Sequence, residues 1–103
     1  MGLLCGVIAL SACMARTRSE PPHAYSPPSG FVPDSVTAVR IAVAVWTPIY
    51  GAKSIADQQP YVATLRGAVW TVRGTLGPDR LGGVAIAEIA KADGRVLRVS
   101  HDR

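Results

Sequence analysis

Residues 61–74 have the sequence Tyr-Val-Ala-Thr-Leu-Arg-Gly-Ala-Val-Trp-Thr-Val-Arg-Gly, and this stretch decides the fold. Apolar residues alternate with Thr and Arg on both sides of Arg66-Gly67, which is typical of two strands joined by a tight turn. Residues 84–90 and 96–101 also have strand character, and Asp93-Gly94 between them is the strongest hairpin signal in the chain. The pattern predicts a meander of four antiparallel strands.

A helical pattern precedes these strands. Pro33-Asp34-Ser35 is typical of a helix start, with Asp34 or Ser35 as the capping acceptor. Pro48 is expected to stop or kink the helix near Thr47, and Gly51 to close it with left-handed backbone. Because many residues here are β-branched, residues 39–45 also fit a buried strand. The apolar residues that recur at helical spacing are Val36, Val39, Val43 and Trp46.

One helix followed by four strands predicts an α+β fold, with an N-terminal helix packed on a curled four-stranded antiparallel meander. The concave apolar face of the sheet would receive the helix, and the opposite face would carry Thr64, Thr71 and Arg73 toward water. Trp46 and Trp70 are expected to meet in the core. Residues 53–59 are polar and predict a loop between helix and sheet.

The N-terminal segment differs in composition from the rest. Residues 1–12 carry no charge and contain a short apolar run, and Leu10-Ser11-Ala12-Cys13 resembles the lipobox of bacterial lipoproteins. We therefore expect a lipoprotein signal peptide over residues 1–12 and lipid on Cys13, although the segment lacks the usual N-terminal Lys or Arg. A buried N-terminal helix is the alternative. Lipidation would place the protein in the bacterial cell envelope, anchored and facing the periplasm.

Residues 13–30 contain two Pro-Pro pairs with polar spacers and predict a linker, with a reach on the order of 50 Å when extended as polyproline II. The folded domain is then residues 31–103, for which a single core is just sufficient. Lys and Arg number 11 against 7 Asp and Glu, which gives a formal charge of +4. The basic residues are scattered rather than clustered, which argues against nucleic acid as a partner.

No catalytic constellation is visible in the sequence. The histidines, His23 and His101, lie far apart, and no Ser, Asp or Glu stands at a spacing typical of a triad. Glu88 and Asp93 are interpreted as a strand-surface glutamate and a turn aspartate. The glycines do not form a phosphate loop, and we expect no metal and no cofactor.

Several motifs together resemble a known family. They are Ala42 to Gly51 (Ala-Val-Ala-Val-Trp-Thr-Pro-Ile-Tyr-Gly), Pro60, Leu65, Ala68 to Thr75 (Ala-Val-Trp-Thr-Val-Arg-Gly-Thr), Gly82-Gly83, Glu88-Ile89 and Asp93-Gly94-Arg95-Val96-Leu97 with His101. This set resembles the small bacterial immunity proteins assigned to the nuclear transport factor 2-like fold. The resemblance implies a reduced form of that fold, close to a cystatin-like arrangement, and a protein that neutralises toxins by binding them, without catalysis.

The expected partner is a protein, either a secreted toxin or a hydrolase. We expect the exposed sheet face or the loops at residues 51–59 and 76–83 to make the contact. The alternatives are a peptidase-inhibitory propeptide-like module and a structural envelope lipoprotein. The candidate partner-binding residues are Tyr50, Lys53, Arg73 and Arg80.

Overall fold

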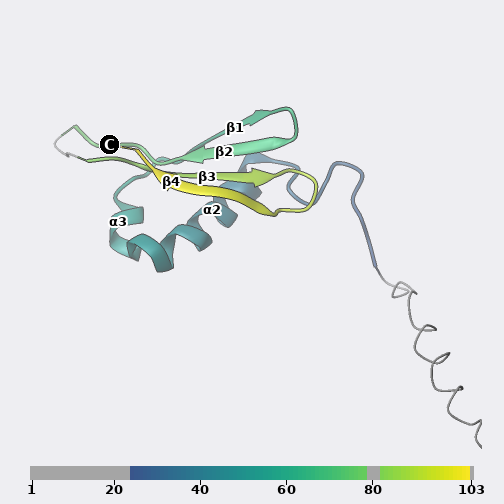
Figure 1. Ribbon diagram of the computed structural model, residues 1–103, viewed down its shortest axis with the longest axis horizontal. Helices are drawn as coiled ribbons and strands as arrows, with labels where there is room; N and C mark the ends of the chain where they lie inside the picture. The colour runs from purple at the N-terminus through teal and green to yellow at the C-terminus, as the bar shows by residue number, and fades with distance from the viewer. Residues whose placement is uncertain (1–23, 79–81, 103) are drawn as a thin grey trace, which may run out of the picture.

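The computed structural model describes residues 24–78 and 82–102. Within these residues two helices precede four strands, and both helices lie on the same side of a single sheet (Figure 1). The predicted α+β class is therefore confirmed. The elements are α2 (Ser35–Tyr50), α3 (Ala52–Ala56), β1 (Val62–Arg66), β2 (Val69–Arg73), β3 (Ala85–Ala90) and β4 (Val96–His101).

The sheet is the predicted antiparallel meander, with strand order β1-β2-β3-β4. Its register places Ala63 opposite Val72, Val72 opposite Ala87, and Ala87 opposite Val99. These residues form one row on the face that receives the helices, which is why Val72 and Ala87 are fully buried. A β-bulge between Glu88 and Ile89 interrupts the register of β3 with β4.

Helix α2 begins as its sequence predicts, because the Asp34 side chain accepts a hydrogen bond from the Thr37 amide at 2.8 Å. The strand alternative for residues 39–45 is wrong. The expected stop near Thr47 is also wrong, since the helix continues through Pro48 to Tyr50. Just before Pro48, the Thr47 hydroxyl donates to the Val43 carbonyl at 2.7 Å. Gly51 has φ 97° and ψ 142°, which is a positive φ but not left-handed helical backbone.

The predicted polar loop at residues 53–59 is partly helical, because Ala52–Ala56 forms α3. Ile55 explains the difference: it is 1% exposed, and one turn of helix lets it enter the core while its polar neighbours stay outside. Lys53 and Asp57 form an ion pair of 2.9 Å across this turn. Ala52, Ile55 and Ala56 recur at the helical spacing i, i+3, i+4, which was the sign of helix in an otherwise polar stretch.

The core lies between α2 and the sheet, and both tryptophans belong to it, as predicted. Trp46 is fully buried and packs against Tyr61, with ring centroids 5.8 Å apart. Trp70 is 7% exposed and donates from its indole Nε1 to the Val32 carbonyl at 2.8 Å. The core also contains Val32, which no periodic pattern in the sequence had marked.

The segment before α2 runs alongside the β3–β4 hairpin. The Phe31 amide donates to the Ala92 carbonyl at 2.9 Å, and the Val32 amide to the Lys91 carbonyl at 3.0 Å. Gly30 packs so closely that an added Cβ would lie 3.2 Å from the Ala92 Cα. These backbone bonds hold Val32 over the end of the sheet, where Trp70 reaches it.

The sheet face opposite the helices is left uncovered by the described residues, as Figure 1 shows. Thr64, Thr71 and Arg73 lie on this face, as the alternation predicted, together with Glu88 and Arg98. Within the described part of the chain, no helix has the length and apolar character needed to cross a membrane.

Candidate functional site

Tyr50 lies at the end of α2 and meets the last strand of the sheet. Its ring packs edge-on against the His101 ring with centroids 5.8 Å apart, and its hydroxyl lies 3.5 Å from His101 Nδ1. A pocket of about 250 Å³ opens beside them, and Ser54, Gln58 and Ala85 are part of its lining. The two aromatic residues therefore form one exposed corner, although 51 positions separate them in the chain.

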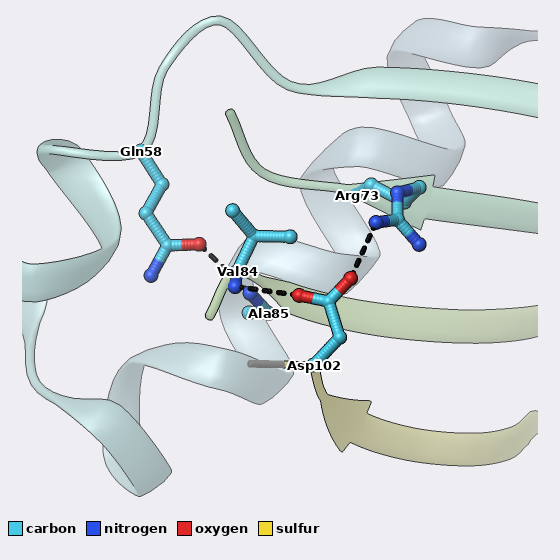
Figure 2. Close-up of polar contacts among 5 residues, drawn as sticks. All are labelled: Gln58, Arg73, Val84, Ala85 and Asp102. Atoms are coloured by element: carbon cyan, nitrogen blue, oxygen red, sulfur yellow. Dashed lines mark hydrogen bonds and ion pairs between the residues drawn. The ribbon is translucent and has the colours of Figure 1, made fainter. Parts of the chain in front are cut away.

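Arg73 ends β2 on the uncovered face and pairs with Asp102 just beyond β4. The guanidinium Nη2 donates to Asp102 Oδ2 at 2.6 Å, and Asp102 Oδ1 accepts from the Val84 amide at 3.0 Å (Figure 2). The pKa of the Asp102 carboxyl lies below its ordinary value, mainly because of the hydrogen bond from the Val84 amide and secondly because of the one from Arg73. Asp102 thereby ties the end of β2 to the start of β3.

Gln58 makes a second tie at the same end of the sheet. Its Oε1 accepts from the Ala85 amide at 2.8 Å, as Figure 2 shows, and its carbonyl accepts from the Thr75 amide at 2.7 Å. No pattern in the sequence marked either Gln58 or Asp102 as a residue that stabilises the fold. Their partners lie 27 and 18 positions away in sequence, so no local pattern could reveal them.

Lys53 is the most exposed of the predicted residues that the structure describes, with a side chain 88% accessible. It projects from α3 toward water and contacts Asp57. The structure thus brings Tyr50, Lys53 and Arg73 to one end of the sheet, formed by α3, the end of β2 and the end of β4 (Figure 1). We call this group the sheet end. Arg80 and Cys13 lie outside the described residues.

Residues with reactive side chains are dispersed. Glu88 faces Arg98 across the β3–β4 pair at 3.9 Å, and Asp93 accepts from the Arg95 amide in the hairpin turn at 2.9 Å. Both interpretations of these acids, as surface and turn residues, are confirmed. Among the described residues, no three His, Cys, Asp or Glu side chains gather as a metal site would require. The exposed groups of the sheet end present charge, hydrogen-bonding groups and aromatic surface to solvent.

Comparison with known proteins identifies the domain. Residues 37–103 match the family described as "NTF2 fold immunity protein". A stretch of 55 residues, 52% of this chain, is 40% identical to "Uncharacterized protein YhhH" of Escherichia coli K12 and covers 43% of that relative. The chain therefore spans less than half the length of this curated relative. No solved structure matches the chain.

Proposed function

The chain belongs to the NTF2 fold immunity protein family, and from this premise we propose that it neutralises a toxin by binding it, without catalysis. The family match is the observation that carries the proposal, because a toxin-immunity role follows from membership in general terms. The geometry supports binding. The described residues present an open sheet face and an exposed sheet end, both typical of a surface that a second protein covers.

We place part of the contact at the sheet end. Tyr50 offers a half-buried amphipathic ring, Lys53 an exposed charge paired with Asp57, and Arg73 a guanidinium. Tyr and Arg are common among energetic hot spots of interfaces. The Tyr50–His101 contact and the Arg73–Asp102 pair hold two of the side chains in place before binding. A preorganised side chain loses less conformational entropy when the partner arrives. We also include Arg80 in the proposed contact, because it lies in the sequence within the predicted contact loop at residues 76–83.

We further propose that Cys13 carries lipid and holds the domain on the periplasmic side of the cell envelope. The apolar run that ends at Leu10-Ser11-Ala12-Cys13 supports this location. The Pro-rich segment after it would let the domain reach away from the membrane surface. A toxin would then be intercepted as it enters the envelope.

A protection assay tests the function. Each secreted toxin encoded near the gene for this chain is exported to the periplasm of Escherichia coli, with and without the full chain, and survival is counted. The proposal predicts that one toxin kills alone and is harmless beside the chain. Protection from none of them would contradict it. Labelling with a palmitate analogue, compared with a Cys13→Ser variant, tests the anchor separately.

A further inference from the structure

The two edges of the sheet differ in how they are protected against pairing with another strand. Along β4, the bulge at Glu88/Ile89 breaks the regular register, and bulges of this kind blunt an edge. β1 has no such irregularity: its five residues pair in continuous register with β2. Among the described residues, no strand pairs with the other side of β1. The β1 edge therefore presents backbone donors and acceptors in a row.

An apolar groove follows β1 on the side of the helices. It has a volume of about 480 Å³ and lies between the strand and the first half of α2. On this side of the strand, Val36 of α2 is 56% exposed and Leu65 of β1 is 40% exposed, although both are aliphatic. Exposed aliphatic side chains beside an unpaired strand edge are typical of a surface that a partner covers. The groove is lined by Ser35, Val36, Val39, Arg40, Tyr61, Val62 and Ala63.

The opposite side of the same strand is polar and cationic. A hollow of about 280 Å³ there is lined by Thr64, Arg66, Thr71 and Arg73. Arg73 is paired with Asp102. No ion pair joins Arg66 to any residue that the structure describes. The β1 edge thus has an aliphatic side and a side with excess positive charge.

We propose that the β1 edge binds an extended segment of the toxin as a fifth strand, in which aliphatic residues alternate with acidic ones. Side chains of a strand point alternately to the two faces of a sheet. The aliphatic residues would enter the groove beside α2, and the acidic residues would face Arg66 and Arg73. Strand addition gives affinity through the backbone, and the side-chain pockets give specificity.

This inference rests on the proposed function and extends its contact surface. Arg73 lies directly opposite Val62 in the register, so the β1 edge and the sheet end join at that point. A five-residue strand alone is too small for a stable complex, since such interfaces bury about 1,600 Å² in total. The β1 edge together with the sheet end offers a larger contact surface than the strand alone.

A second copy of the chain fits the β1 edge less well than an acidic strand. On the uncovered face, β1 itself contributes Val62, Thr64 and Arg66, none of which is acidic. A second copy would bring another Arg66 to a surface that already has excess positive charge. Its strand would therefore add no counter-charge to the hollow.

Two leucines on opposite edges provide a matched test. Leu65 on β1 is 40% exposed and Leu97 on β4 is 41% exposed. Leu65→Glu places a charge on the helix side of β1, where it removes apolar contact with the aliphatic residues of the incoming strand. Using the full chain and the purified toxin found by the protection assay, we expect Leu65→Glu to weaken binding by about tenfold or more. Leu97→Glu should stay within about twofold of the unsubstituted chain.

Circular dichroism and thermal melting establish that each variant is folded. If Leu65→Glu does not fold, Val36→Asp replaces it, because an acidic residue in the first turn of a helix is favourable. A similar affinity for the Leu65 and Leu97 variants would overturn the inference while the protein's immunity function stands. Failure of the unsubstituted chain to bind any toxin would overturn both. Self-association that Leu65→Glu abolishes would assign the edge to a second copy and also overturn the inference.

Discussion

The indole Nε1 of Trp70 lies 2.8 Å from the Val32 carbonyl oxygen and donates to it inside the core. This bond joins the centre of the sheet to the segment that enters α2. Trp46, on the other side of the core, is also buried, but its Nε1 has no hydrogen-bond partner among the described residues. The two tryptophans therefore contribute to stability in different ways, and the difference can be measured.

Replacing each tryptophan by phenylalanine separates packing from hydrogen bonding. Both substitutions remove part of a buried ring, but only Trp70→Phe leaves the Val32 carbonyl without its indole donor. We expect Trp70→Phe to lower the free energy of unfolding by about 1–3 kcal/mol more than Trp46→Phe does. Urea unfolding followed by circular dichroism measures both. Equal losses would show that the Trp70 bond adds nothing to packing.

A larger residue at position 74 is expected to destabilise the fold, because Gln58 packs closely against Gly74. A Cβ added at Gly74 would lie 2.8 Å from the Gln58 Cβ, closer than van der Waals contact allows. Gly74→Ala should therefore displace Gln58 from the Ala85 amide and cost about 1–3 kcal/mol in unfolding free energy. Gly67→Asn is the control, because its site is open and asparagine tolerates its positive φ. An unchanged melting temperature for Gly74→Ala would contradict the tight packing of Gln58.

The Asp102 carboxylate should make the stability of the fold depend on pH in the acidic range. Its pKa is lowered in the folded protein by the Val84 amide and by Arg73, so its contribution is fully present above its unfolded pKa. That contribution is lost as the pH falls through the folded pKa, below pH of about 4. We expect Asp102→Asn to melt at a lower temperature than the unsubstituted chain at neutral pH, with the difference shrinking at low pH. Asp34 titrates in both proteins and cancels from the comparison.

Melting curves recorded from neutral pH to strongly acidic pH measure this difference. A gap between the two proteins that stays constant across the whole series would show that the charge of Asp102 does not act through its bonds to Val84 and Arg73.

Lys53 distinguishes a binding role from a structural one. Its ion pair with Asp57 is exposed, and such pairs contribute less than about 1 kcal/mol. Lys53→Ala should therefore leave the melting temperature nearly unchanged while it weakens toxin binding by about fivefold or more. Titration calorimetry and thermal melting together test this. Unchanged affinity would remove Lys53 from the proposed contact surface.

The strands were predictable because alternation and turn residues are local signals. Residues 61–74 and Asp93-Gly94 specify two hairpins without help from the rest of the chain, and the observed strands differ from the predicted ones by about one residue at their ends. The extension of α2 through Pro48 was not predictable from the proline alone. The packing of the rest of α2 against the core stabilises the helix by more than the missing backbone hydrogen bond of Pro48 destabilises it.

The candidate site was predictable only in part. Tyr50, Lys53 and Arg73 were named from the sequence, but their convergence at one end of the sheet depends on contacts across 29 and 51 positions. Nothing local marks Asp102 as the partner of Arg73. The β1 edge was also missed, because a strand pattern does not say whether the strand is central or at an edge.

The stoichiometry of neutralisation tests the central claim most directly. Purified toxin is mixed with increasing amounts of the full chain, and the remaining toxin activity is measured after prolonged incubation. If the chain acts by binding, activity falls in proportion to the chain added and reaches zero near a fixed stoichiometric ratio, whatever the incubation time. Complete loss of toxin activity at a small fraction of that ratio, growing with time, would show turnover and contradict the account.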